Sequence, residues 1–280
     1  MTHELDLAVL LAGPCLAAAM AMLVLSKSCR YYLKYTVYML GVSLVALTMT
    51  PIFMFRPFNV LNFVLASAIC KNISRLIGLH WVLRGREHLA EQRACVIVAN
   101  HQSSLDILGM FEYWNVMKKC TVVAKKELFY AWPFGLAAWL CGLIFIDRLN
   151  SGRAKDSINK AATQIKQDQV KLWIFPEGTR KNTGEIHPFK KGAFHVAVSA
   201  QLPILPVVYS PYYFLDDRHR TFDSGNVIIS ALPPISTEGL TMEDIDSLME
   251  RVRQCMVDEF MKMSKEVKSD LLPPYQISGS

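Results

Sequence analysis

The chain has 280 residues, of which 52% are hydrophobic and only 19% are charged, and its formal net charge is +6. This length predicts one globular domain with an N-terminal membrane element and leaves little room for a second domain. The positive charge suits anionic partners such as phospholipid headgroups. Nucleic acid is not expected as a partner, because no basic stretch carries interleaved aromatic residues. The odd number of cysteines, without any CxxC pair, indicates neither a zinc site nor a disulfide framework.

Residues 1–56 predict two hydrophobic membrane helices. The runs Leu7–Ser26 and Tyr35–Phe55 contain no charged residue, and each is about as long as a bilayer crossing requires. The basic and aromatic segment Lys27–Lys34 separates them, as is typical of a membrane interface. The acidic flank MTHELD argues against a cleaved signal peptide. The next apolar stretch, Pro57–Cys70, is too short to span, so residues 57–80 are expected to form an interfacial or packed helical connection.

From Trp81 onward short apolar runs alternate with amphipathic segments, which predicts an α/β fold over residues 81–263. The expected strands are Cys95–Ala99, Thr121–Ala124, Leu143–Ile146, Val170–Phe175, Ile204–Tyr209 and Val227–Ala231. The expected helices are Ser104–Val116, Arg153–Gln167, Gly192–Ala200 and Met242–Lys262. Residues 264–280 are polar and contain prolines, so we expect a flexible tail there.

A histidine and an aspartate follow the strand Cys95–Ala99, in the segment NHQSSLD. Side chains in loops at the carboxyl ends of strands form the sites of α/β sheets. His101 lies in such a loop, so the chain can fold back and bring the Asp106 carboxylate to the imidazole. The carboxylate would hold the ring in the tautomer that removes a proton from a hydroxyl. The same spacing fits a structural histidine beside an aspartate that caps the next helix, with Ser103 or Ser104 as its N-cap.

A second polar segment, FPEGTR, comes directly after the strand Val170–Phe175. Gly178 allows a ligand to approach the backbone closely, and Arg180 offers a planar guanidinium suited to phosphate. A strand-end turn with a surface ion pair explains the same residues. A metal site is not expected, because no ligand spacing links the histidines outside NHQSSLD.

Two apolar segments and two lysine pairs carry weaker signals. In GLIFIDR a predicted apolar strand is followed by Asp147 and Arg148, which would lie at its end. An ordinary core strand that ends at the protein surface has the same pattern. LPILPVV contains Pro206 and predicts an edge strand or a strand start, because proline has no amide hydrogen to donate. Cations at helix starts oppose the helix dipole, and either an anionic ligand or a solvated charged face would explain the pairs Lys125–Lys126 and Lys190–Lys191.

In this order the segments NHQSSLD, GLIFIDR, FPEGTR and LPILPVV resemble the 1-acylglycerol-3-phosphate acyltransferase family, in its animal alpha and beta form. The resemblance covers residues 75–260 and the N-terminal anchor. It implies a glycerolphosphate acyltransferase-like mixed sheet flanked by helices. It also implies acyl transfer from acyl-CoA to the sn-2 hydroxyl of lysophosphatidate, which yields phosphatidate and CoA at the endoplasmic reticulum membrane. Acyl-CoA is then a co-substrate, and no cofactor is expected.

The resemblance also implies residue roles. His101 would be the general base and Asp106 its orienting partner. The substrate-binding residues would be Arg148, Glu177, Gly178, Arg180 and Pro206, to which the helix-dipole argument adds Lys190 and Lys191. Another lysophospholipid or glycerol 3-phosphate as acceptor stays open, as does a thioesterase that uses the dyad to activate water. A non-catalytic lipid-binding protein is disfavoured, because both members of the dyad are present.

The positive-inside rule and the expected acyl donor place the C-terminal domain on opposite sides of the membrane. The positive-inside rule places Lys27–Lys34 in the cytosol, and two crossings would then leave the C-terminal domain on the lumenal side. Acyl-CoA is normally cytosolic. Either the first run does not cross, or the two runs form a hairpin that enters and leaves the same leaflet.

Overall fold

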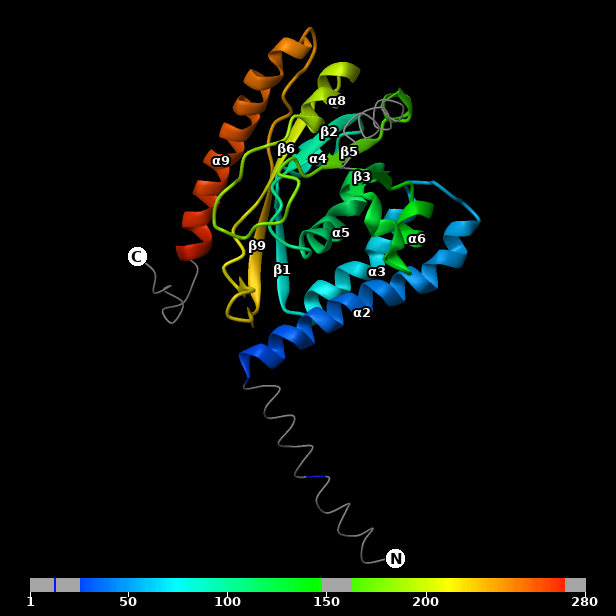
Figure 1. Ribbon diagram of the computed structural model, residues 1–280, viewed down its shortest axis with the longest axis vertical. Coiled ribbons are helices and arrows are strands. Elements are labelled where there is room, and N and C mark those ends of the chain that lie inside the picture. Colours follow the sequence, from blue (N-terminus) through cyan, green and yellow to red (C-terminus); the bar gives the residue numbers. More distant parts are fainter. Residues whose placement is uncertain (1–12, 14–25, 148–162, 270–280) are drawn as a thin grey trace, which may run out of the picture.

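A computed structural model of the chain describes residue 13 and residues 26–147 and 163–269 (Figure 1). Its centre is a sheet with helices on both faces, which confirms the predicted α/β class. The sheet strands are β1 (Leu79–Arg84), β2 (Cys95–Ala99), β3 (Cys120–Lys125), β4 (Ile144–Ile146), β5 (Lys171–Ile174), β6 (Ile204–Tyr209) and β9 (Gly225–Ala231). A small hairpin adds β7 (Leu215–Asp216) and β8 (Thr221–Phe222). The helical elements are α2 (Lys27–Met54), α3 (Asn62–Leu76), α4 (Arg86–Ala90), α5 (Asp106–Met117), η1 (Lys126–Tyr130), α6 (Phe134–Leu140), α8 (Gly192–Ala200), η2 (Met242–Asp244) and α9 (Ile245–Ser269).

The strand order β1-β9-β6-β2-β5-β3-β4 brings the loops with polar motifs to one edge of the sheet. Neighbouring strands run parallel except for β6 and β9, which pair in the antiparallel sense. The carboxyl ends of β2, β5, β3 and β4 therefore meet at the same edge. Ligands bind at that edge in open α/β sheets.

Strand β2 shows how the two faces of the sheet are covered. All five of its side chains are buried, as expected of a strand covered by helices on both faces. Ile97 and Ala99 belong to the core shared with α2, α3, α5 and α6, whereas Val96 and Val98 belong to the core shared with α8 and α9. Figure 1 shows the same division, with α9 on one side of the sheet and α2, α3 and α5 on the other.

The segment that was expected to separate two membrane helices is itself helical. Residues Lys27–Lys34 are not a loop between two hydrophobic runs but the first turns of α2, whose N-cap is Ser26. This helix is the only one in the described part of the chain that is long and apolar enough to cross a membrane. The first run, Leu7–Ser26, lies outside the described residues apart from Gly13 and Ser26. Helix α2 packs against α3 and α6 and therefore belongs to the same core as the sheet.

Two further expectations need correction. Helix α9 extends to Ser269, because its apolar stripe continues through Met263 and Val267, so residues 264–269 are helical rather than part of a flexible tail. Pro206 lies in β6, an interior strand rather than an edge. The pairing of β6 with β9 begins one residue later at Val207, so the missing amide hydrogen of the proline is not needed there.

Candidate active site

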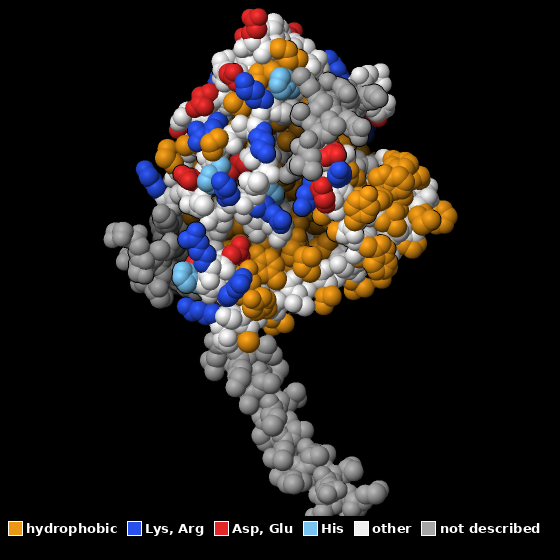
Figure 2. All heavy atoms as spheres, viewed as in Figure 1, with side chains coloured by type: hydrophobic (Ala, Val, Ile, Leu, Met, Phe, Trp, Pro, Cys, Tyr) orange, Lys and Arg blue, Asp and Glu red, His pale blue; other side chains and the backbone are white. Residues whose placement is uncertain are grey.

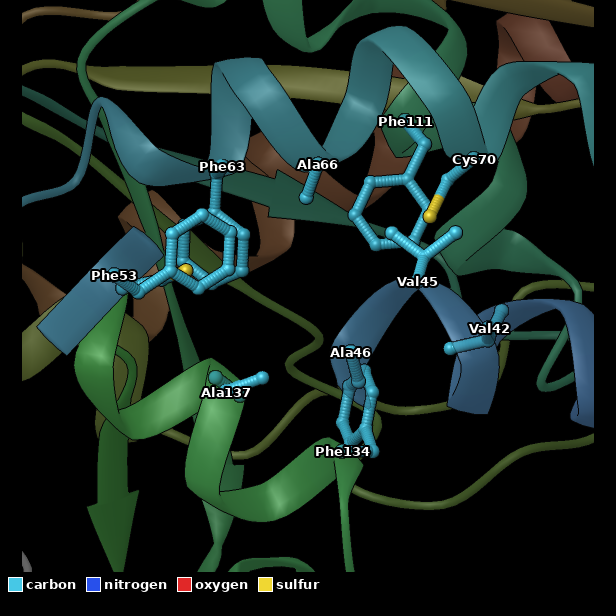
Figure 3. A pocket seen from close by; sticks show the side chains of 12 residues that line it. Val42, Val45, Ala46, Phe53, Phe63, Ala66, Cys70, Phe111, Phe134 and Ala137 are labelled. Carbon is cyan, nitrogen blue, oxygen red and sulfur yellow. The ribbon is translucent and has the colours of Figure 1, made fainter. Parts of the chain in front are cut away.

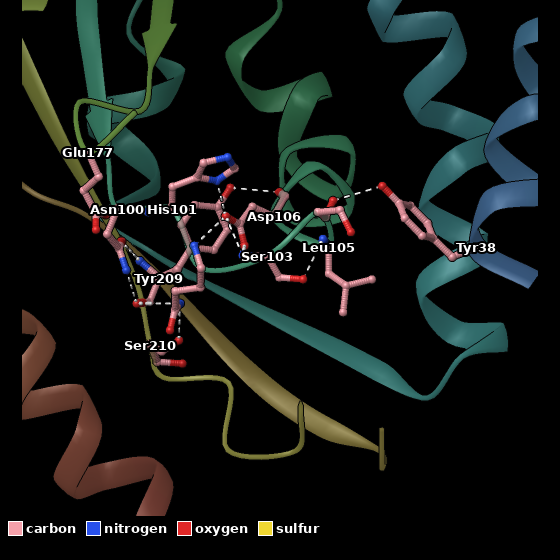
Figure 4. A network of polar contacts seen from close by, with 11 residues as sticks. Tyr38, Asn100, His101, Ser103, Leu105, Asp106, Glu177, Tyr209 and Ser210 are labelled. Carbon is pink, nitrogen blue, oxygen red and sulfur yellow. Dashed lines mark hydrogen bonds and ion pairs between the residues drawn. The ribbon is translucent and has the colours of Figure 1, made fainter. Parts of the chain in front are cut away.

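His101 and Asp106 meet at the end of β2. The Nδ1 atom of His101 is 2.6 Å from Oδ2 of Asp106 (Figure 4). The aspartate side chain is 1% exposed and the histidine side chain 22%, so the carboxylate is shielded while the imidazole reaches the surface of a cavity. The ring stacks on Phe175, with centroids 4.0 Å apart, and is thus held on its face as well as at Nδ1. The sequence did not single out Phe175 for this contact.

The backbone before α5 fixes the position of the carboxylate. Oδ2 of Asp106 also accepts the amide hydrogen of Gln102 at 2.9 Å, and the Ser103 amide donates to the same group. These donors identify the carboxylate as an acceptor, so the proton of the contact between the two side chains belongs to His101 Nδ1. Neither Ser103 nor Ser104 is the N-cap that we expected, because α5 begins at Asp106 and Leu105 precedes it.

Side-chain amides tie this loop to strand β6. Asn100 donates to the carbonyl oxygen of Tyr209 at 3.1 Å and accepts from the Tyr209 amide at 2.8 Å. Gln102 donates to the carbonyl oxygen of Ser210 at 2.9 Å, and the Tyr209 hydroxyl donates to the carbonyl oxygen of Asp106 (Figure 4). Buried side chains with directional bonds of this kind fix a loop in one geometry.

Glu177 joins the two polar segments of the site. Its Oε1 accepts the His101 amide hydrogen at 2.7 Å, and its Oε2 accepts that of His187 at 3.2 Å. The Lys181 amide in turn donates to the carbonyl oxygen of His101. Burial raises the pKa of Glu177, and the two backbone amides oppose that rise. The carboxylate thus holds backbone in place, and the structure does not show it among the residues that line the cavity.

The cavity beside His101 has a polar end and an apolar end, and its volume is about 580 Å³. At the polar end its walls include Gly178 and Arg180 from the FPEGTR segment and Lys125 from the end of β3. Gly178 has a φ of +71°, which only glycine adopts without strain, and Lys190 lies directly against it. The polar end of the cavity is therefore cationic, and an anionic group would be stabilised there.

The apolar end lies between α3, α5, α6 and the sheet. Its walls are Phe63, Ile107, Met110, Trp114, Leu128, Phe134 and Leu143. Only Leu143 belongs to one of the four quoted segments, GLIFIDR, and the sequence analysis named none of the seven as a site residue. Tyr38 of α2 lies between the two ends, and its hydroxyl donates to the carbonyl oxygen of Ser104 at 2.9 Å (Figure 4).

The other predicted site residues lie elsewhere. Arg148 is outside the described residues. Lys191 pairs with Asp246 of α9 at 2.7 Å. The structure places Pro206 within the sheet and not among the residues that line the cavity. Lys126 pairs with Asp147 at 2.6 Å.

A second His–Asp pair, on the protein surface, shows what distinguishes the pair formed by His101 and Asp106. His219 and Asp216 in the β7–β8 hairpin are also 2.6 Å apart, but the His219 side chain is 80% exposed. Hydrogen bonding to His219 lowers the pKa of Asp216, as expected of a surface pair. Only the pair at the end of β2 combines a shielded carboxylate with an imidazole that lines a cavity, among the pairs in the described ranges.

Comparison with known proteins finds relatives that match most of the chain. Residues 80–210 match the family described as Acyltransferase. The chain is 40% identical over 242 residues to 1-acyl-sn-glycerol-3-phosphate acyltransferase alpha of Homo sapiens, covering 86% of this chain and 85% of that protein. It is 36% identical over 259 residues to the beta protein of Homo sapiens, covering 90% and 92%.

A solved structure has the same fold. The crystal structure of the 1-acyl-sn-glycerophosphate acyltransferase of Thermotoga maritima superposes with a TM-score of 0.63 and covers 84% of this chain and 98% of that one. The two sequences are 21% identical, so this likeness concerns the fold.

Proposed function

Because the chain belongs to the 1-acyl-sn-glycerol-3-phosphate acyltransferase family and is therefore an acyltransferase, we propose that it acylates the sn-2 hydroxyl of lysophosphatidate with acyl-CoA as donor. The products are phosphatidate and CoA. The observation that carries this proposal is the pairing of His101 with a shielded Asp106 at the junction of a cationic and an apolar part of one cavity. A lysophospholipid and an acyl-CoA each need both kinds of surface.

His101 acts as the general base of the proposed reaction. Its Nε2 removes the proton of the sn-2 hydroxyl while the hydroxyl oxygen attacks the thioester carbonyl. Asp106 holds the ring through Nδ1 and stabilises the imidazolium that forms. The tetrahedral intermediate then collapses, the carbon–sulfur bond breaks, and the imidazolium returns the proton to the CoA thiolate.

The cations at the polar end of the cavity bind the phosphate of the acceptor. Arg180 lines this part, and its planar guanidinium matches two phosphate oxygens. The backbone at Gly178 lies beside the Lys190 ammonium, which adds positive charge to the same segment. Glu177 positions this segment against the His101 loop rather than contacting the acceptor.

A fatty acyl chain occupies the apolar end, where burial of each methylene is worth about 0.8 kcal/mol. Tyr38 of α2 lines the cavity, so the helix that we propose to contact lipid lies beside the substrate site. Figure 2 shows hydrophobic side chains gathered on one part of the surface, with lysines and arginines on the part beside it. The exposed apolar side chains include Leu40, Leu44, Met54, Phe55, Tyr130 and Trp132.

Helix α2 holds the protein at a membrane in this proposal. One face of α2 packs on α3 and α6, so lipid can contact only the opposite face, which carries Leu40 and Leu44. This packing favours a helix that stays against the domain within one leaflet over one that crosses alone. The endoplasmic reticulum is the proposed membrane, on the grounds of the family resemblance.

The test is acyl transfer by the purified protein in detergent or vesicles. Radiolabelled oleoyl-CoA is supplied with lysophosphatidate, and in parallel with lysophosphatidylinositol, monolysocardiolipin and glycerol 3-phosphate. We expect labelled phosphatidate and poor use of the other acceptors. Free oleate in place of phosphatidate would indicate a thioesterase. Transfer to another acceptor would keep the mechanism and replace the substrate.

A further inference from the structure

The β7–β8 hairpin is docked on the first turns of α2. Figure 1 shows the hairpin, in yellow, beside the blue start of the helix, and the two elements are in contact. The Tyr31 hydroxyl donates to Oδ1 of Asp217 at 2.7 Å, and Arg30 pairs with Asp223 at 3.6 Å. Two carboxylates of this segment therefore bond to the helix, and the hairpin keeps a fixed position at the helix start.

The third carboxylate of the hairpin is bonded within the turn. Asp216 accepts the backbone amide hydrogens of Arg218 and His219 at 2.8 and 3.1 Å, and its Oδ2 is 2.6 Å from Nδ1 of His219. Three cations of the same region, Lys27, Arg218 and Arg220, are exposed. Segments 27–34 and 215–224 together carry five Lys or Arg residues and three Asp residues, which gives a net charge of +2 with histidine neutral. The surface formed by the hairpin and the helix start is therefore cationic.

Aromatic and aliphatic side chains adjoin this cationic surface. The Arg220 guanidinium lies 5.7 Å from the ring centroids of both Tyr31 and Tyr32. Tyr32 is 54% exposed and Leu33 is 48% exposed, so the surface passes from cations through a tyrosine to an aliphatic side chain. Figure 2 shows lysines and arginines beside hydrophobic side chains at the lower end of the domain. Tyrosines and cations together at the end of an apolar helix are typical of the headgroup level of a membrane.

The packing of α2 fixes the direction in which this surface faces. Figure 3 shows Val42, Val45 and Ala46 of the helix facing Ala66 and Cys70 of α3, and all five side chains are buried. One side of α2 is thus held against the domain, and the hairpin is held at its start. When the opposite side of α2 lies against lipid, the cations at its start lie at the level of the headgroups.

We propose that Lys27, Arg218 and Arg220 form a docking surface for the headgroups of anionic phospholipids at the point where α2 meets the membrane. The inference rests on the membrane placement within the proposed function and not on acyl transfer itself. Each Lys or Arg close to an anionic leaflet strengthens binding about fivefold, and the attraction acts within a Debye length of the surface. Lysophosphatidate and phosphatidate are anionic as well, so this surface favours membranes that contain them.

The experiment measures amide hydrogen exchange of residues 215–224 in the full chain, reconstituted in lipid nanodiscs. The discs contain phosphatidylcholine with increasing fractions of phosphatidylserine, an anionic lipid that is neither the proposed substrate nor the product. We expect exchange in the hairpin to slow as phosphatidylserine is added. The slowing should vanish in high salt, which screens exposed charges. Equal exchange at every phosphatidylserine content would overturn the proposal.

Charge variants make the result specific to this surface. Arg218→Gln keeps most of the side-chain length without the charge, so the phosphatidylserine fraction that gives half of the slowing should rise about fivefold. With Lys27→Gln added, the slowing should disappear. Arg251→Gln is the matched control, because Arg251 is exposed on α9, on the opposite side of the sheet, and its loss should leave the response unchanged. A double variant that responds like the wild type would overturn the proposal.

Arg218→Lys keeps the charge and should respond to phosphatidylserine as the wild type does, which covers the case in which Arg218→Gln releases the hairpin from α2. If this lysine variant shows wild-type exchange in phosphatidylcholine but no response to phosphatidylserine, charge does not hold the lipid and the proposal is overturned. Acyl transfer assayed in the same discs tests the proposed function separately. Phosphatidate formed without a phosphatidylserine response overturns only this inference, and a response without phosphatidate overturns only the proposed reaction. A protein that does not enter the discs would overturn the membrane placement and the inference with it.

Discussion

The two ends of the large cavity are held together in different ways. At the polar end directional bonds hold the loop that carries His101: Asp106 accepts from His101 and from two backbone amides, and Glu177 joins two loops. At the apolar end Phe63, Trp114 and Phe134 are positioned by packing between helices. A hydrogen bond has one correct geometry, whereas packed rings tolerate volume-conserving changes. Substitutions at the polar end should therefore lower activity even when they change a single atom. Substitutions at the apolar end should do so only when they change the side-chain volume.

The largest effect should come from His101→Ala. General-base catalysis contributes about 10²–10⁴-fold, so the variant should lose that factor in kcat while it stays folded. Phosphatidate formation is the measurement. His219→Ala is the matched control, because His219 has the same contact to an aspartate on the exposed hairpin and should keep full activity. A folded His101→Ala protein with most of its rate would contradict the dyad mechanism.

Glu177→Gln should have the next largest effect. Glutamine keeps the shape but offers one acceptor oxygen and an NH₂ group, so one of the two amide hydrogens of His101 and His187 loses its partner. A bond to a charged group is worth about 1.5–3 kcal/mol, so we expect a loss of that size in the free energy of unfolding and a lower kcat. Denaturant unfolding and acyl transfer measure the two effects. Glu185→Gln, at an exposed position of the same segment, is the control.

Arg180→Ala should weaken the binding of the acceptor lysophosphatidate and leave the binding of acyl-CoA nearly unchanged. Loss of a bidentate phosphate contact should raise the KM for lysophosphatidate by about tenfold, with a much smaller change for acyl-CoA. Steady-state kinetics with each substrate varied in turn distinguish the two. The neighbouring Lys181→Ala removes a cation that does not line the cavity, and should leave both values near those of the wild type. Equal increases in KM for both substrates in Arg180→Ala would argue against a phosphate site.

The smallest effect concerns a lysine far from the cavity. Lys171 is 2% exposed, its ammonium donates to the carbonyl oxygen of Met117, and burial lowers its pKa. The protonated folded form is therefore penalised, so Lys171→Met should stabilise the protein by of the order of 1 kcal/mol near neutral pH. The gain should shrink as pH rises through the lowered pKa of the folded state, since the wild-type lysine then loses its charge. Thermal unfolding over a pH series measures this, with the exposed Lys166→Met as control.

The difference between the two ends also explains what the sequence could predict. The strands Cys95–Ala99 and Ile204–Tyr209 and the helix Gly192–Ala200 have the predicted bounds, because buried apolar runs and their flanking breakers are local signals. The family resemblance is likewise confirmed by the comparisons.

The parts that could not be predicted depend on contacts distant in sequence. Phe63 and Phe134 line one cavity from helices more than sixty positions apart, and each looks like an ordinary core residue in its own segment. The interior position of Pro206 depends on where β9 starts to pair. Glu177 was assigned to the substrate on the resemblance, whereas its backbone contacts to His101 and His187 appear only in the folded chain. The roles of the site residues remain predictions.

Helix α2 lies between the large cavity and the outer surface of the protein. Its inner side carries Tyr38, which lines the large cavity, and the buried Val42 and Val45, while Leu40 and Leu44 are exposed. In the proposed membrane-bound state, lipid contacts the outer side of the same helix whose inner side lines the cavity beside His101. In that state, a property of the bilayer that displaced α2 would also displace Tyr38 in the wall of the cavity.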